Sequence, residues 1–516
     1  MDIAAGLMHG FALALQPANL WWCFVGVLLG TVVGIMPGLG PPATIAMLLP
    51  LTALMNPAGA IIMLAGIYYG AKYGGSTTSI LLNVPGESAS VVTCIDGYQM
   101  ARKGRAGPAL GIAAIASFIA GTVGVIGLML ISPPLARFAL AFSSPEYFAL
   151  MTLGLAMVVL LAGRSMVKAL LAMLVGLWLA GIGTDPFSTT SRFTFGRMEL
   201  LSGIDFVVVA IGIFALGEVL ANMEAREEPQ ALPVPKGLRN LLPTLRDLRD
   251  CRFAFVNGSV IGFLIGVLPG AGSTIASFIS YGVEKAFSRR RDEFGTGVIE
   301  GVAAPEGANN SETGGALVPL LTLGIPGSGT TAILLAALVL WGFKPGPLFI
   351  SEHPEMFWGL VASMYIGNVM LLILNLPLVP LFAQVLRAPV YVLYPVIFGL
   401  SIVGVYTVSG SVFDLALLAG FGLLGYVMRK LDYPSAPLVL GLVLGGAMER
   451  ALRQSLMMSE GSLGILVSRP ISALMLACAA LVLLIPFFAR LNTWRLRHSP
   501  APAHPRMPSS RRGRSR

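Results

Sequence analysis

Two motifs built from glycine and proline occur twice in this chain, and their residues could bind a small ion or solute. The first is Pro-Gly-Leu-Gly at 37–40, and it returns as Pro-Gly-Ala-Gly at 269–272. The second runs from a Gly-Gly pair to a Pro-Gly pair at 74–86 and returns, one residue longer, at 314–327. Proline breaks helices, and glycine lets a ligand approach the backbone. Helix ends at these motifs would offer N–H groups that suit a carboxylate and carbonyls that suit Na⁺, which predicts a site formed by broken helices in both halves.

Hydroxyl and amide side chains cluster at or just beyond these breaks. A serine or threonine within a helix can also hydrogen-bond its own backbone, but clustering beside a break in both halves favours a binding role. Gly-x3-Gly spacing is foremost a packing device, so we interpret Gly26, Gly30, Gly258 and Gly262 as packing positions. The predicted substrate- or ion-binding residues are Pro37, Gly38, Gly40, Thr44, Ser76, Thr77, Thr78, Asn83, Pro85, Gly86, Pro269, Gly270, Gly272, Ser273, Thr274, Asn309, Asn310, Pro326, Gly327 and Ser328.

Four ionisable residues, Lys72, Glu87, Glu306 and Glu312, lie inside or beside the motifs, where burial in a membrane is costly and usually functional. We interpret Lys72 and Glu87 as possible charge partners of the substrate or ion. Two alternatives stay open: Glu87 could cap the helix that follows it, and Lys72 could extend its side chain to the membrane surface. Other acids are expected at solvated helix ends, namely Asp96, Asp205, Glu284 and Glu300.

The elements that position these residues must be membrane helices. Of the 516 residues, 55% are hydrophobic and only 11% are charged, and the mean hydropathy is +0.80. Soluble domains carry about 25% charged residues. Continuous apolar runs such as 109–131 are long enough to cross about 30 Å of hydrocarbon as helices. We predict an all-α polytopic membrane protein with about 10–12 membrane segments.

The positions of Lys and Arg predict the orientation of these segments, because cytoplasmic loops carry an excess of both. Basic residues flank 253–287 on both sides, so this stretch should enter and leave on the cytoplasmic side as a re-entrant hairpin. The equivalent stretch 19–56 lacks such flanks and should face the other side, which predicts two repeats of inverted topology. The expected parts are a first transmembrane repeat at 1–223, a cytoplasmic linker at 224–252, a second repeat at 253–490 and a basic, disordered cytoplasmic tail at 491–516.

Several other classes of function are not expected. The scattered cysteines and histidines form no metal-binding pattern, so no metal site is predicted apart from transient Na⁺ binding. The sequence offers no paired nucleophile and base and no H-E-x-x-H, so an enzyme is not expected. It has no Gly-x4-Gly-Lys-Ser/Thr phosphate loop, and no cofactor is predicted. We interpret the arginine-rich tail as an anchor to anionic membrane lipid and not as a nucleic-acid-binding segment.

Extended forms of the motifs carry a family resemblance. They include Gly-x2-Pro-Gly-Leu-Gly-Pro at 34–41, Tyr-Gly-x2-Tyr-Gly-Gly-Ser-Thr-Thr-Ser-Ile-Leu-Leu-Asn-Val-Pro-Gly-Glu at 69–87 and Asp-Gly-Tyr-x-Met-Ala-Arg-Lys-Gly-Arg-Ala-Gly-Pro-Ala-Leu-Gly at 96–111. Glu-Gly-Ala-Asn-Asn at 306–310 and Leu-Thr-Leu-Gly-Ile-Pro-Gly-Ser at 321–328 continue the pattern. The chain from about residue 18 to 490 resembles the large permease subunit, of TctA type, of the tripartite tricarboxylate transporters.

The resemblance implies a carrier of the bacterial inner membrane that works with a small four-helix membrane subunit and a periplasmic solute-binding protein. It implies uptake of citrate or a related carboxylate, driven without ATP by an ion gradient, with Na⁺ as the expected coupling ion. The resemblance implies an uncharged residue at position 72, so Lys72 departs from the expected pattern; two alternatives stay open, that the charge alters the preferred substrate or that it is tolerated. A dicarboxylate or an aromatic acid fits as well as citrate. The alternative function is a stand-alone organic-anion carrier or exporter without a binding protein.

Overall fold

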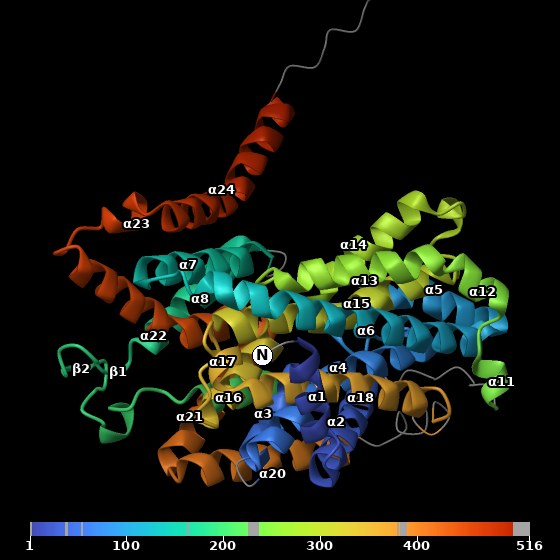
Figure 1. Ribbon diagram of the computed structural model, residues 1–516, viewed down its shortest axis with the longest axis horizontal. Helices are drawn as coiled ribbons and strands as arrows, with labels where there is room; N and C mark the ends of the chain where they lie inside the picture. Colours follow the sequence, from blue (N-terminus) through green and yellow to red (C-terminus); the bar gives the residue numbers. More distant parts are fainter. Residues whose placement is uncertain are drawn as a thin grey trace, which may run out of the picture.

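The protein is almost entirely helical in the part that the computed structural model describes, which comprises residues 3–36, 40–52, 55–161, 165–224, 237–378, 381 and 390–498 (Figure 1). A two-stranded antiparallel ribbon, β1–β2, is the strand structure within those ranges. The prediction of an all-α polytopic protein is therefore confirmed. The elements up to residue 222 are α1 (Ile3–Ala14), α2 (Pro17–Ile35), α3 (Pro41–Thr52), α4 (Pro57–Leu82), η1 (Ser88–Ser90), α5 (Val91–Met100), η2 (Ala101–Arg105), α6 (Ala106–Ala139), α7 (Ser144–Leu161), α8 (Met166–Ala180), β1 (Gly183–Thr184), β2 (Ser191–Arg192), η3 (Met198–Leu200), α9 (Phe206–Ala210), η4 (Ile211–Leu216) and α10 (Gly217–Asn222).

The later elements begin within the predicted linker. They are α11 (Leu238–Leu241), α12 (Leu245–Asp250), α13 (Arg252–Val267), α14 (Gly272–Phe287), η5 (Arg291–Glu293), α15 (Glu300–Leu323), α16 (Gly329–Leu340), α17 (Phe349–Glu352), α18 (Pro354–Asn375), α20 (Val390–Ser409), α21 (Val412–Lys430), α22 (Ser435–Met458), α23 (Ile465–Ser468) and α24 (Pro470–His498). Residues 225–236 of the predicted linker and 499–516 of the predicted tail lie outside the described residues.

Six helical stretches among the described residues are long and apolar enough to cross a membrane. They are Pro17–Ile35, Ser88–Ala139, Ser144–Leu161, Pro354–Asn375, Val412–Lys430 and Ser435–Met458. Shorter apolar helices of 10–17 residues accompany them, including α3, α13 and α16. Short helices next to Pro-Gly motifs are what broken spans produce. The predicted count of membrane segments and their orientation in the membrane stay predictions.

The predicted hairpin break of the second half lies where the sequence placed it. Helix α13 ends at Val267 and α14 begins at Gly272, and the two helices pack against each other. Gly270 and Gly272 have φ angles of 86° and 63°, which side chains rarely tolerate. In the first half, α2 ends at Ile35 and α3 begins at Pro41. The break is present there as well, but its residues Pro37 and Gly38 lie outside the described residues.

Glycines bring the helix before each break into backbone contact with a long neighbour. A Cβ on Gly30 in α2 would lie 2.6 Å from the carbonyl oxygen of Ile67 in α4. A Cβ on Gly262 in α13 would lie 2.4 Å from the carbonyl oxygen of Ala308 in α15. Gly26 and Gly258 make equivalent approaches to the same two helices. The interpretation of these four glycines as packing positions is confirmed.

Replacing Gly258 with leucine should lower the amount of protein in the membrane. A Cβ at this position would lie 2.8 Å from the Ala304 carbonyl oxygen, so α13 and α15 must move apart. The measurement is the membrane level by quantitative immunoblot. Gly282→Leu is the matched control, because Gly282 is exposed on α14 with open space around its Cβ position among the described residues. Equal levels for the two variants would contradict this packing role.

The same local structure follows α4 and α15. Each helix ends on a residue in the left-handed conformation, Asn83 with φ 58° and Gly324 with φ 69°. A Pro-Gly pair follows in each case, and then Glu87 and Ser328 begin the next helical segment with a capping box. The two copies of this motif are thus alike in backbone geometry as well as in sequence.

The two copies of the second motif correspond without an inserted residue, which corrects the expectation that the second copy is one residue longer. A Cβ on Gly74 would contact the Thr31 carbonyl oxygen of α2, and a Cβ on Gly315 would contact the Phe263 carbonyl oxygen of α13. Thr31 and Phe263 each follow the central glycine of their motif by one residue. Gly74 therefore corresponds to Gly315 and not to Gly314. The comparison of sequences paired the first glycines of the two Gly-Gly pairs. The structure instead pairs the glycines whose Cα atoms face the neighbouring helix, Gly74 and Gly315.

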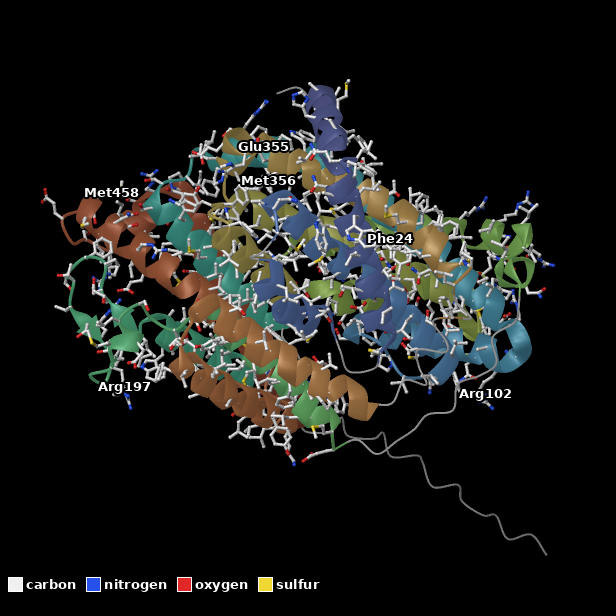
Figure 2. All side chains as sticks on the ribbon, turned by 90° about the horizontal axis from the view of Figure 1, so that it is seen from below. Phe24, Arg102, Arg197, Glu355, Met356 and Met458 are labelled. Atoms are coloured by element: carbon white, nitrogen blue, oxygen red, sulfur yellow. The ribbon has the colours of Figure 1, made fainter. Side chains whose placement is uncertain are left out.

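A polar loop lies at one end of the long axis. The β1–β2 ribbon belongs to the connection between α8 and α9, which carries Arg197, and it is at the opposite end from the α5–α6 turn, which carries Arg102 (Figures 1 and 2). Ion pairs join this connection to α22: Arg192 to Glu449 at 2.8 Å and Arg453 to Asp185 at 3.0 Å.

Candidate functional site

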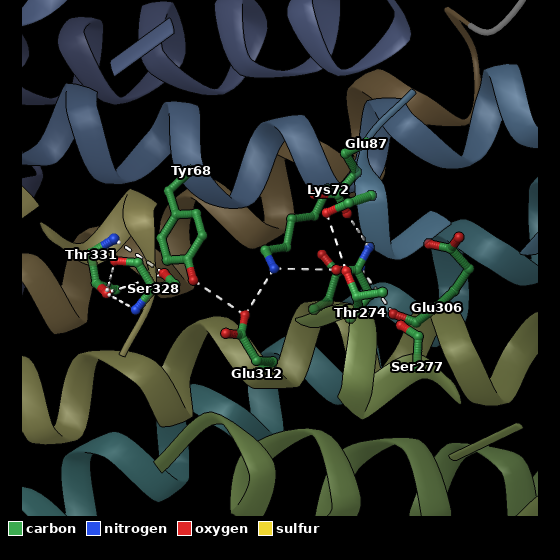
Figure 3. Close-up of polar contacts among 12 residues, drawn as sticks. Tyr68, Lys72, Glu87, Thr274, Ser277, Glu306, Glu312, Ser328 and Thr331 are labelled. Carbon is green, nitrogen blue, oxygen red and sulfur yellow. Dashed lines mark hydrogen bonds and ion pairs between the residues drawn. The ribbon is translucent and has the colours of Figure 1, made fainter. Parts of the chain in front are cut away.

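Helices α4 and α15 carry charged and amide side chains into the interior of the protein (Figure 3). Both helices are buried along almost their entire length, although neither is apolar enough to be among the six candidate spans. Contacts between rising residue numbers on α4 and falling numbers on α15 show that the two helices run antiparallel. We call the polar group between them and η1–α5 the central cluster; its residues are Tyr68, Lys72, Glu87, Thr93, Glu306, Asn309 and Glu312.

An ion pair joins the two halves of the chain at the middle of this cluster. The Lys72 Nζ lies 2.8 Å from Oε2 of Glu312, and each side chain is 2% exposed. The Tyr68 hydroxyl donates to the same carboxylate oxygen over 3.2 Å, and the Lys72 ammonium lies 5.1 Å from the centre of the Tyr68 ring. Two charges without water are stable only when they are paired and hydrogen-bonded, as these are.

Asn309 links this ion pair to a second carboxylate. Its Oδ1 accepts a hydrogen bond from Lys72 over 3.2 Å, and its Nδ2 donates to Oε1 of Glu87 over 2.5 Å. Glu87 also forms the capping box of η1. Glu87 therefore caps the following segment, as one alternative predicted, and its carboxylate belongs to a buried polar network. Its role as a charge partner of the substrate or ion stays a prediction.

Glu306 extends the cluster by one turn of α15. The Thr93 hydroxyl donates to its Oε1, while its Oε2 has no hydrogen-bond partner among the described residues. The side chain of Glu306 is fully buried. Within the described cluster, the three carboxyl groups of Glu87, Glu306 and Glu312 thus face one ammonium group. Such an arrangement favours the binding of a cation and disfavours the binding of an anion unless a cation binds with it.

The structure brings some of the predicted site residues together and leaves others apart. Lys72, Glu87 and Asn309 belong to the central cluster, and Thr274 of α14 contacts Ser88, next to Glu87, at 3.1 Å between hydroxyl oxygens. The two Pro-Gly breaks of the second half touch each other, because the Gly270 N–H donates to the Gly327 carbonyl over 2.7 Å. The hairpin tip is therefore fixed beside the break that follows α15.

Several predicted hydroxyl and amide groups bond their own surroundings. Thr44, Ser76 and Thr78 donate to carbonyls of their own helices, the competing role foreseen for them. Asn310 faces α6, where its Nδ2 donates to Ser117, and Asn83 is an exposed helix end. Ser328 caps α16. A binding role stays a prediction for these and for Gly40, Thr77, Pro85, Gly86, Pro269, Gly272, Ser273 and Pro326.

Four residues outside the predicted binding set join the cluster: Glu306 and Glu312, which the sequence analysis had noted as ionisable residues beside the motifs, and Tyr68 and Thr93, which it had not singled out. Helical spacing could have pointed to three of them: Tyr68 lies four residues before Lys72, and Glu306 and Glu312 lie three residues either side of Asn309, so each shares a helix face with a predicted residue. Recognising Thr93 required knowledge of how α5 folds back on α15.

Three acids that were expected at solvated helix ends are buried, so that expectation is wrong for Asp96, Glu284 and Glu300. Asp96 is the clearest case: its carboxylate accepts the N–H groups of Gly295, Gly297 and Val298 over 2.7 to 3.0 Å, and the Tyr281 hydroxyl over 2.8 Å. The loop before α15 folds over this acid and removes it from water. Asp205 is exposed and caps α9, as expected.

Replacing Asp96 with asparagine should destabilise the contact between α5 and the loop before α15. The variant loses the charge and half of the acceptor capacity that the loop N–H groups use, at a cost of about 1.5–3 kcal/mol for hydrogen bonds to a charged group. The measurement is the thermal midpoint of the purified protein. Asp292→Asn is the control, because that side chain is 92% exposed. An unchanged midpoint for Asp96→Asn would show that the loop holds without this carboxylate.

The architecture defines the class: a polytopic α-helical membrane protein in which broken helices enclose a buried charged cluster. Residues 20–440 match the family described as the Tripartite tricarboxylate transporter TctA family. The chain is 47% identical over 495 residues to an uncharacterised 52.8 kDa protein in the TAR-I ttuC' 3' region of Agrobacterium vitis, a match that covers 96% of this chain and 98% of that protein. It is 45% identical over 227 residues to an uncharacterised protein in the TAR-II ttuC' 3' region of the same organism, covering 43% of this chain and 94% of that protein. No solved structure matches. The chain therefore belongs to the TctA family, the large membrane subunit of tripartite tricarboxylate transporters.

Proposed function

We propose that this chain is the permease subunit of a binding-protein-dependent secondary transporter that imports citrate or a related carboxylate, coupled to an ion gradient, with Na⁺ as the coupling ion. The family supports a transport role. The observation that carries the proposal is the chain of buried contacts from Glu312 through Lys72 and Asn309 to Glu87, which joins the two halves. Buried charge at a repeat interface is typical of sites where a solute and an ion are moved together.

The carboxylate and the cation would use different parts of the site. The central cluster has an excess of carboxyl groups, whose negative potential favours a cation bound near it. The tip of the hairpin suits the substrate, because α14 begins at Gly272 without a side-chain cap among the described residues. Space around the Gly272 Cβ position is open among those residues, and Ser273 and Thr274 follow it. The free N–H groups and the helix dipole at this end favour a carboxylate.

The proposed assembly has three proteins: this permease, a small four-helix membrane subunit, and a periplasmic solute-binding protein that selects the solute. The permease would lie in the bacterial inner membrane with its basic C-terminal tail in the cytoplasm. Anionic lipid is the expected partner of that tail. The coupling ion acts transiently, and no resident cofactor is proposed.

The experiment is uptake of labelled citrate by cells that express all three proteins, with Na⁺ present or replaced by K⁺. Uptake that needs all three proteins and Na⁺ is the expected result. Uptake by this chain alone would replace the proposal with the stand-alone carrier. Absence of citrate uptake would be followed by a panel of dicarboxylates and aromatic acids tested against the binding protein. Failure of every carboxylate, with all three proteins present in the correct compartment, would overturn the proposal.

A further inference from the structure

Helix α15 has a second polar face, separate from the central cluster. Asn310 and Thr313 lie three residues apart and therefore share one side of the helix. Their side chains are buried, at 4% and 1% exposed. Asn310 Oδ1 and Thr313 Oγ1 have no hydrogen-bond partner among the described residues. A buried oxygen without a partner costs about 1–3 kcal/mol, so two of them on one helix face call for an explanation.

Both residues line one cavity, which lies between α15, α4, α6 and α18. Its volume is about 10 Å³, close to the space of one water molecule or one small ion. The other lining residues are Tyr69, Gly121, Val125, Met364 and Asn368.

The orientation of the Asn310 amide follows from its donors. Its Nδ2 donates to the Ser117 hydroxyl over 2.7 Å and to the Glu306 carbonyl over 3.0 Å, which fixes the nitrogen and leaves Oδ1 as the free acceptor. Asn368, across the cavity, is also fixed: its Nδ2 donates to the Phe118 carbonyl and to Thr122 over 2.9 Å, and its Oδ1 accepts from the Tyr73 hydroxyl over 2.6 Å. Two neutral oxygens of the lining, Asn310 Oδ1 and Thr313 Oγ1, therefore remain without a partner among the described residues, while Val125 and Met364 contribute apolar surface.

We propose that this cavity binds a single monovalent cation, Na⁺, and is the coupling-ion site of the permease. The inference rests on the proposed function and specifies where its ion binds. Hard cations prefer oxygen ligands, and neutral oxygens suit a single positive charge. Glu306 lies one turn away on α15, and its unpartnered carboxyl oxygen adds negative potential. The residues that line the cavity include no His, Cys, Asp or Glu, so the site differs from those that hold a divalent metal.

The position of the cavity on α15 lets ion binding influence the central cluster through that helix. Thr313 follows Glu312, the partner of Lys72, so one helix carries the cation on one face and the ion pair on another. A cation that binds one arrangement of α15 better than another shifts the equilibrium between the two arrangements. The ion would thereby bias the packing of α15 against α4, where the two halves meet.

The test measures Na⁺ binding without transport. The purified full-length chain in nanodiscs is heated at increasing NaCl, with choline chloride keeping the ionic strength constant. For the wild type, the thermal midpoint should rise with Na⁺ and saturate. Thr313→Val removes an oxygen without breaking a protein hydrogen bond, so its midpoint in choline should equal or exceed that of the wild type. Its apparent Kd for Na⁺ should rise at least about tenfold, which corresponds to about 1.4 kcal/mol.

Thr322→Val is the matched control. Thr322 is also fully buried on α15, but its hydroxyl donates to the Val318 carbonyl and does not line the cavity. This variant should keep the Na⁺ dependence of the wild type. Thr313→Ala gives a second variant if the valine expresses poorly.

Two results would overturn the inference: a wild type whose midpoint does not depend on Na⁺, or a Thr313 variant that keeps the wild-type dependence. Either can occur while carboxylate uptake persists, in which case the transport proposal stands and only the ion site fails. Conversely, Na⁺ stabilisation that Thr313→Val abolishes, in a protein that transports no carboxylate, would keep the site and remove the proposed substrate.

Discussion

Replacing Lys72 with methionine is expected to abolish uptake and to reduce the amount of folded protein. The change leaves the Glu312 carboxylate buried without its ammonium partner, 2.8 Å away in the wild type. Removing one member of a buried ion pair costs about 3–5 kcal/mol, which is a large share of the stability of most proteins. The measurements are the membrane level, the thermal midpoint of the purified protein, and labelled carboxylate uptake normalised to the membrane level.

The double variant Lys72→Met/Glu312→Gln separates stability from function. Neutralising both residues removes the unpaired charge, so the membrane level should recover toward that of the wild type. Uptake should not recover if the cluster takes part in transport, because the coupled charges are gone. Lys430→Met is the control: its ion pair with Glu224 is more than half exposed on both sides, and such pairs contribute little. Recovery of uptake by the double variant would show that the ion pair is purely structural.

The sequence predicted those features of the fold that local chemistry determines. Proline and glycine stop a helix wherever they occur in its interior, so the break between α13 and α14 was predictable from Pro269 and Gly270 alone. The packing role of Gly262 was predictable for a similar reason, because glycine spaced by four residues leaves one helix face without side chains. Neither inference requires knowledge of which helix becomes the neighbour.

The pairing across the central cluster could not be predicted in this way. Lys72 and Glu312 lie far apart in the chain, and their contact depends on the register of two antiparallel helices. Glycine contacts such as Gly34 on Ala71 and Gly266 on Glu312 fix α4 and α15 only against their neighbours α2 and α13 within each half. How α4 then meets α15 depends on the packing of the two halves, which residue types in the sequence do not record. The sequence therefore identified charged residues of the site without identifying their partners.

Asp96 shows a second limit. An acid near basic residues and at the end of an apolar segment is predicted to be exposed to water. Hydropathy averages over residues that are neighbours in the chain and not over residues that are neighbours in the fold. The groups that bury Asp96 come from Tyr281 and from the loop at 295–298, in the other half of the protein. A carboxylate that accepts several backbone N–H groups is stable when buried, but only the folded structure supplies them.

Replacing Gly270 with alanine is expected to reduce uptake strongly while the membrane level stays near normal. A Cβ at this position would lie 2.4 Å from Cα of Val158 in α7, and the φ angle of 86° adds strain of about 1–2 kcal/mol. The tip must therefore move, which stretches its 2.7 Å hydrogen bond to Gly327. A displacement that raises the transport barrier by about 1.4 kcal/mol lowers the rate of uptake tenfold. Because the clash is with backbone atoms, we expect the loss of uptake to be larger than tenfold.

Alanine variants of two other glycines, Gly272 and Gly282, separate the effect of backbone strain from the effect of the clash with α7. Gly272→Ala meets the same kind of backbone strain, with φ 63°, but open space among the described residues, so its effect should be smaller. Gly282 has no left-handed φ angle, and its Cβ position has no neighbour among the residues that the structure describes, so Gly282→Ala should transport normally. The order Gly282, Gly272, Gly270 in increasing loss of uptake at equal membrane level would indicate that transport depends on where the tip sits against α7. Normal uptake by Gly270→Ala would show that the hairpin tip can shift without consequence, and the substrate would then have to bind elsewhere.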